Sequence, residues 1–248
     1  MPLPRHSVRR TRCHRVWTYS TLERFGRSGW GLPNHAASAI AKARNVPTPP
    51  QILAELHTIA NQAQTLATLW HILVLMALIG LISGWRPSRR FVASALVLPV
   101  SSVAVMAWIH GNPFNGAIFT VLALTLSILG LRMPEDATWR PPQWALALGL
   151  AMVVFGIGYP HFLDAGSLLG YLYAAPTGLI PCPTLAFVIG VALVVDGLGS
   201  RAWALVLAGA GLFYGVFGVA RLGVALDVGL IVGAVGLLAR GVKLRAAS

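Results

Sequence analysis

The chain has 248 residues, of which 56% are hydrophobic and only 10% are charged, and its formal net charge is +12. Soluble domains have about 45–50% apolar and about 25% charged residues, so the composition excludes an ordinary solvated surface. It predicts an all-α, polytopic bundle of transmembrane helices.

Most of the positive charge lies in residues 1–49, where nine Lys or Arg side chains accompany a single acidic one, Glu23. Residues 50–248 carry ten basic and six acidic side chains. The ten lie between or after hydrophobic runs, where the basic residues of cytoplasmic loops belong. We therefore expect the lipid bilayer, and no nucleic acid, as a partner.

The first 66 residues divide into two parts. Residues 1–49 lack hydrophobic periodicity and the apolar core of a secretory signal, so we expect a basic disordered tail or a mis-assigned start, with translation then beginning near Val46. In residues 50–66 apolar side chains recur every three or four positions, which predicts an amphipathic helix on the membrane surface or against the bundle.

Residues 67–240 are predicted to form the transmembrane bundle, and 241–248 a short basic cytoplasmic tail. A helix needs about 17–25 residues to cross about 30 Å of hydrocarbon. Seven spans are expected, or six if Pro176, Pro181 and Pro183 prevent the fifth from crossing. The predicted spans are 67–85, 91–109, 114–132, 143–159, 180–196, 202–220 and 222–239.

The short loops predict the orientation. With seven spans, nine basic side chains fall on one side and only Arg221 on the other. The positive-inside rule places the first side in the cytoplasm, so the N-terminus is outside and the C-terminus inside. The abundance of Arg, Ala, Gly and Pro suggests a GC-rich bacterial genome, which makes the inner membrane the expected location.

The sequence lacks the motifs that mark several classes of protein. The two lysines, Lys42 and Lys243, lie outside the spans, which excludes a retinal Schiff base and a Walker A lysine. The sequence has no HExxH and no CxxC, so zincin proteases and the usual redox or zinc signatures are excluded. The sequence requires no cofactor, and enzymatic activity is less expected than transport.

The leading hypothesis is a permease for a small solute or ion. Asp227 lies within the last predicted span, where an ionisable side chain is costly and marks a candidate site, unless it pairs with Arg221 or nearby backbone. The Pro-Cys-Pro segment predicts irregular backbone, which membranes tolerate only inside protein or beside a wet cavity. The residues predicted to line the path are Asp227, His110, Asn112, Tyr159, Cys182, Pro181 and Pro183.

Two other hypotheses come from different classes. His110, His161 and Asp164, with Cys182 as a further ligand, predict a metal or haem site facing outward, if they are not ordinary interfacial side chains. Glycines four residues apart inside spans predict close helix packing, and with it a non-catalytic scaffold or a homo-oligomer. Those glycines are Gly80 and Gly84, Gly211 and Gly215, and Gly229 and Gly233.

Three motifs also carry a resemblance: Asn112-Pro113 before the third span, Tyr159-Pro160-His161, and the run from Gly178 through Pro181-Cys182-Pro183 to Thr184. With the amphipathic stretch, they make residues 48–240 similar to a family of small bacterial multi-pass membrane proteins of unknown function. The resemblance implies a fold and a topology, but no reaction.

Overall fold

Most of the long helices begin where an apolar run follows a capping residue or a proline. The computed structural model describes residues 48–136, 139–164 and 168–244. Within these ranges every regular element is a helix and no strand occurs, which confirms the all-α prediction for the described residues. The predicted basic tail, apart from its last two residues, lies outside them, as do residues 245–248.

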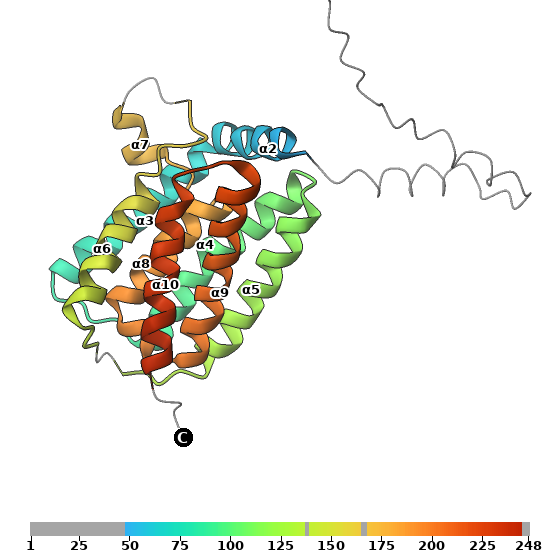
Figure 1. The fold of residues 1–248 in the computed structure, drawn as a ribbon. Helices are drawn as coiled ribbons and strands as arrows, with labels where there is room; N and C mark the ends of the chain where they lie inside the picture. Colours follow the sequence, from blue (N-terminus) through green and yellow to red (C-terminus); the bar gives the residue numbers. More distant parts are fainter. Residues whose placement is uncertain (1–47, 137–138, 165–167, 245–248) are drawn as a thin grey trace, which may run out of the picture. The chain divides into compact units, whose positions relative to one another are not determined.

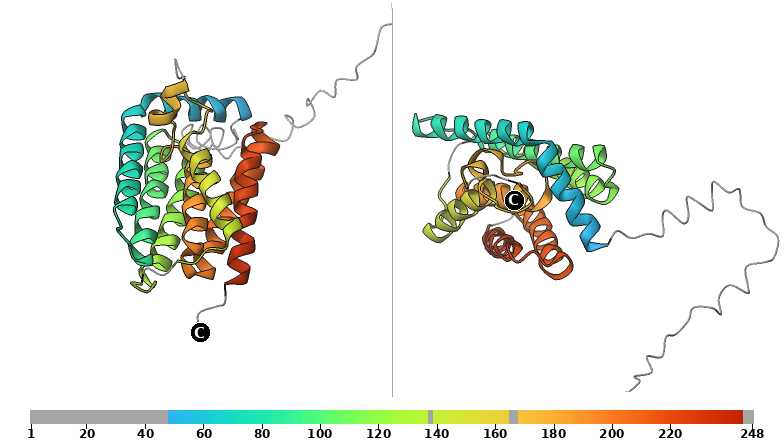
Figure 2. Two further views of the ribbon diagram at one scale, coloured as in Figure 1. Left: turned by 90° about the vertical axis from the view of Figure 1, so that its left-hand side faces the viewer. Right: turned by 90° about the horizontal axis from the view of Figure 1, so that it is seen from above.

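Helix α2, Pro49–Gln62, starts with a capping box. The side chain of Thr48 accepts a hydrogen bond from the backbone amide of Gln51, and the side chain of Gln51 accepts one from the backbone amide of Thr48. The helix buries one apolar face, Leu56, Ile59 and Ala60, and runs across one end of the bundle (Figures 1 and 2). The predicted amphipathic stretch 50–66 falls on α2 and on the start of the next helix, because the first helix ends at Gln62 and the chain bends at Ala63.

The remaining long helices run along the bundle in alternating directions (Figure 1). They are α3 Gln64–Ile82, α4 Arg89–Ile109, α5 Pro113–Leu131, α6 Gln143–Ile157, α8 Pro181–Val194, α9 Arg201–Phe217 and α10 Asp227–Lys243. Three short elements complete the described fold: α7 Leu168–Ala174, a 3-10 turn Asp196–Gly199 and a π turn Gly218–Leu222.

Four helical segments among the described residues are long and apolar enough to cross a membrane: Gln64–Ile82, Arg89–Ile109, Pro113–Leu131 and Arg201–Leu222. These helices confirm that the protein has segments able to span a membrane. Helices α6 and α8 coincide with two further predicted spans, but they have 15 and 14 residues, fewer than the about 17 needed to cross alone. A count of seven spans stays a prediction.

Helix α8 occupies the centre of the packing, since every residue from Pro181 to Gly190 is buried. Glycines let α6 approach it closely: a Cβ added to Gly149 would lie 2.8 Å from the carbonyl oxygen of Gly190. Small residues at such crossings are the usual means of packing helices in lipid. Helix α3 differs, because Ala67 is its one buried residue and its leucines and isoleucines from Leu69 to Ile82 are exposed.

The bundle has two chemically different ends. The α2 end comprises α2, α7 and the turns that follow α4, α6 and α9 (Figure 1). The arginine end comprises the turns that precede α4, α6 and α9 and the last turn of α10. Its arginines include Arg86, Arg89, Arg90, Arg132, Arg140, Arg201 and Arg240.

Candidate functional site

A buried carboxylate lies at the α2 end. Asp227 is 1% exposed, and its two oxygens each accept one hydrogen bond. The Tyr159 hydroxyl donates to Oδ1 at 2.8 Å, and the Cys182 thiol donates to Oδ2 at 3.2 Å. These three residues, here called the Asp227 network, come from α10, from the loop after α6 and from α8.

The start of α10 places Asp227. The sequence predicts a last span over 222–239, with Asp227 inside it. The helix begins later, because Gly223 adopts a left-handed conformation (φ 71°) that ends the π turn, and the helix restarts at Asp227 itself. The carboxylate therefore lies at a helix N-terminus, where the helix dipole favours negative charge.

The start of α8 places Cys182. Ile180 is extended and Pro181 is the first helical residue, a position where the missing amide hydrogen costs nothing. The hydroxyl of Thr184 accepts a hydrogen bond from the Gly178 amide at 2.8 Å and donates to the Ile180 carbonyl at 2.7 Å. The irregular backbone thus precedes Pro181, and the Pro-Cys-Pro segment is the first turn of a buried helix.

Gly218 makes room for the carboxylate. A Cβ at this position would overlap Asp227 Oδ2, so no larger residue fits while Asp227 keeps its place. Gly218 also begins the π turn that joins α9 to the loop before α10. Such π segments occur often at functional sites, because they displace a side chain from helical register.

A second buried polar pair lies nearby. The Tyr214 hydroxyl donates to Asn115 Oδ1 at 2.9 Å, and the Asn115 amide donates to Asn112 Oδ1 at 3.0 Å. The Asn112 side-chain amide in turn donates to Glu55 Oε2 on α2 at 3.3 Å. These contacts lead from the partly exposed Glu55 into the bundle.

A small cavity of about 20 Å³ lies between the two polar groups. Cys182, Asn115 and Tyr214 line it, and Ile52 and Leu56 of α2 also border it. About 10–15 Å³ suffices for one water molecule when polar partners are present. The contacts and the cavity together form a polar row, namely Glu55, Asn112, Asn115, Tyr214, Cys182, Asp227 and Tyr159.

The structure brings only some of the predicted path residues together. Tyr159, Cys182 and Asp227 touch directly, Pro181 lines the cavity, and Asn112 joins through Asn115. The other two predicted residues are placed outside these contacts: His110 Nδ1 lies 2.9 Å from the carbonyl oxygen of Met106, and Pro183 is buried within α8.

The predicted metal ligands are not assembled. His161 packs its ring against Phe162, with centroids 4.1 Å apart, while Asp164 Oδ1 lies 3.1 Å from Nε2 of His57 on α2. The described part of the chain contains no group of three or more His, Cys, Asp or Glu side chains that could hold a metal ion. His110, His161 and Asp164 therefore form no ready metal centre, because local hydrogen bonds and stacking hold each in a different place.

Sequence reasoning missed Glu55, Asn115, Tyr214 and Gly218. Asn115 carried a weak signal, since it lies three residues after Asn112 at a helix start, where such side chains cap backbone amides. Tyr214 has a polar hydroxyl within an apolar helix, which needs a partner when buried. The role of Gly218 depends on a contact across nine residues that no local pattern encodes.

The chemistry of the Asp227 network is that of an acceptor for a proton or a small cation. Among the described residues no Lys or Arg forms an ion pair with Asp227. Its partners are two uncharged donors in place of Arg221. A buried carboxylate without a paired cation is costly, so the site favours any change that neutralises it.

Comparison with family models, curated proteins and solved structures finds no match to this chain. The resemblance to small bacterial multi-pass membrane proteins therefore remains a prediction, and arguments about function rest on the geometry above.

Proposed function

We propose that this protein is an integral membrane permease for a small solute or ion, and that the Asp227 network is its proton- or cation-binding site. The observation that carries the proposal is a buried carboxylate that lacks an ion-pair partner among the described residues. It accepts a hydrogen bond from Cys182, which lines a water-sized cavity. In membrane proteins, carboxylates placed this way commonly serve ion pathways and proton relays.

Binding of a proton to Asp227 would change the hydrogen bonding between α8 and α10. With both oxygens accepting, the geometry suits an ionised Asp227. A protonated oxygen becomes a donor, so either Tyr159 or Cys182 must then rearrange its hydrogen bond. Cys182 belongs to α8 and Asp227 to α10, so the charge on Asp227 would act directly on the contact between these helices.

Helix α2 is proposed as the cover of the site. Its side chains Ile52 and Leu56 border the cavity, and α2 packs on the bundle through a single apolar face. Because the cavity holds about one water, a solute larger than water would need α2 to move before it reached Cys182.

The membrane arrangement proposed with this function has seven spans in a bacterial inner membrane, with the arginine end in the cytoplasm. Support comes from the gathering of the loop arginines at one end of the bundle. Helix α8 is almost fully enclosed by other helices, so its 14 residues need not match the bilayer thickness.

The deciding experiment is proton or cation flux into proteoliposomes that contain purified protein and an internal pH-sensitive or cation-sensitive dye. Asp227→Asn keeps the size of the side chain but removes its charge, and we expect it to lower flux at least tenfold. Asp164→Asn is the matched control, because this carboxylate lies at the same end but is exposed and outside the network.

Equal flux for wild type, Asp227→Asn and empty liposomes would contradict the proposal, provided that both proteins are folded. Folding is checked by circular dichroism and by a single symmetrical peak in gel filtration. Cys182→Ser retains a donor to Asp227 and should keep much of the flux, whereas Cys182→Ala should lose more.

A further inference from the structure

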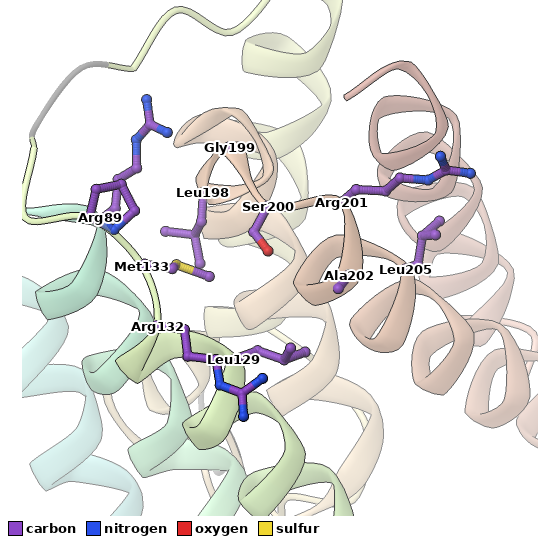
Figure 3. A pocket seen from close by; sticks show the side chains of 11 residues that line it. Arg89, Leu129, Arg132, Met133, Leu198, Gly199, Ser200, Arg201, Ala202 and Leu205 are labelled. Carbon is purple, nitrogen blue, oxygen red and sulfur yellow. The ribbon is translucent and has the colours of Figure 1, made fainter. Parts of the chain in front are cut away.

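A pocket of about 460 Å³ lies at the arginine end, between the starts of α4 and α9 and the end of α5 (Figure 3). It is separate from the Asp227 network, since α4, α5 and α9 have their opposite ends near that network. Nothing in the proposed transport function uses it.

Three arginines rim this pocket, each from a different element. Arg89 starts α4, Arg132 caps the end of α5 and Arg201 starts α9 (Figure 3). Arg89 is tied to Asp136, with Nε 3.2 Å from Oδ1. In the part of the chain that the structure describes, no carboxylate pairs with Arg132 or Arg201, and both side chains are exposed.

The remaining lining is largely apolar. Leu129, Met133, Leu198 and Leu205 provide side chains without charge or hydrogen-bonding groups (Figure 3). The pocket therefore combines arginine side chains with an apolar lining. This combination suits a ligand that has an anionic headgroup and a hydrocarbon chain.

The backbone fixes the wall nearest to Arg89. Four consecutive residues, Asp196 to Gly199, have positive φ between 58° and 63°, a strained conformation for Asp196 and Leu198. Arg240 holds this left-handed turn by donating to both carboxylate oxygens of Asp196, at 2.6 and 2.9 Å. A Cβ at Gly199 would collide with the guanidinium of Arg89, so the turn and the arginine fit only with glycine there.

The same turn leads into the first turn of α9. Ser200 caps this helix by accepting from the Trp203 amide at 3.3 Å. The first amides of a helix have no partners within it, and together with the helix dipole they attract anions. At this end of the bundle that attraction adds to the positive charge of Arg132 and Arg201.

We infer that this pocket binds the phosphate headgroup of an anionic phospholipid. Helices α4, α5 and α9 belong to the segments long and apolar enough to cross a membrane, so their ends lie where headgroups are expected. Basic pockets between membrane helices are suited to acidic headgroups. The inference requires that the helices span the bilayer, but it does not depend on transport.

Native mass spectrometry of the full chain in detergent tests this binding, with phosphatidylglycerol, phosphatidylcholine and inorganic phosphate as separate probes. We expect phosphatidylglycerol to bind at least tenfold more tightly than phosphatidylcholine. Arg132→Gln combined with Arg201→Gln should lower its affinity about 25-fold, as each arginine near a membrane surface adds about fivefold. Inorganic phosphate at millimolar concentration should displace little lipid, because it lacks the hydrocarbon body.

The control removes two charges from the same end outside the pocket, by Arg86→Gln with Arg140→Gln, and should leave the affinity unchanged. Ala202→Trp keeps all charges but fills the pocket, and it should also weaken binding. Equal affinity for the two lipids, full displacement by phosphate, or unchanged binding in both pocket variants would each overturn the inference.

Discussion

The two ends of the bundle each hold a buried or half-buried carboxylate, but they hold it by different means. At the α2 end, Asp227 is enclosed by packing and bonded to two uncharged donors. At the arginine end, Asp196 is bonded at both oxygens by one guanidinium and is 17% exposed at its side chain. Charge pairing thus accounts for Asp196 as a structural element, whereas the hydrogen-bond donors that hold Asp227 are uncharged.

This difference gives each end its proposed role. A carboxylate that is already paired gains little from a proton or a cation, so Asp196 serves to hold a turn. A carboxylate that is buried beside uncharged donors gains more from a proton or a cation, because neutralisation removes the cost of burying its charge. Each of the following changes tests one part of this contrast, in order of decreasing effect.

Gly218→Ala should have the largest effect, because the new methyl group would overlap Asp227 Oδ2 and break the Asp227 network. We expect the free energy of unfolding to fall by about 3 kcal/mol, as for an overpacked core. Unfolding of the purified protein by denaturant, followed by circular dichroism, measures this loss.

Gly209→Ala is its matched control, since Gly209 lies on the same helix and an added Cβ there meets nothing within 4 Å. It should be neutral or slightly stabilising, because alanine is the better helix former. Similar losses for both variants would show that α9 responds to any added methyl group, and that packing around Asp227 is not special.

Arg240→Gln should have an intermediate effect, because it removes both charged hydrogen bonds that hold Asp196 in a left-handed conformation. We expect a loss of about 2 kcal/mol. Lys243→Gln, which removes an exposed charge from the same turn, should cost far less. The same denaturation assay compares the two.

Asp196→Gly sharpens this result. Like Asp196→Ala, it removes the ion pair with Arg240. Glycine, however, adopts positive φ without strain, which stabilises the folded state by about 1 kcal/mol relative to alanine. Asp196→Gly should therefore be more stable than Asp196→Ala. The reverse order would mean that the turn stores no strain at this position.

Asp164→Asn should have the smallest effect. Its partner His57 and Asp164 itself are 47% and 73% exposed at their side chains, so water screens their interaction. We expect a change of less than about 0.5 kcal/mol in the free energy of unfolding. A loss near that of Gly218→Ala would place a structural carboxylate in the exposed loop and weaken the contrast between buried and exposed acids.

Part of the candidate site was predictable from single residues. An aspartate among apolar residues and a cysteine between two prolines are unusual enough to mark Asp227 and Cys182. Their partner was harder to find, because Tyr159 joins them across 23 and 68 positions of chain. The prediction of a metal site from His110 and His161 rested on residue type alone. The fold places these two histidines in separate surroundings, which depend on distant parts of the chain.

The sequence by itself determined that this protein is helical and apolar enough for a membrane, because hydropathy and helix signals act over neighbouring residues. It also determined that the loop arginines would gather at one end, since alternating helices return the chain to the same side each time. Only the tertiary structure decided where α10 begins, which donors meet Asp227 and how three arginines come to rim one pocket. These depend on close contacts between distant helices, such as the fit of Gly218 against Asp227 and of Gly199 against Arg89, which no local pattern records.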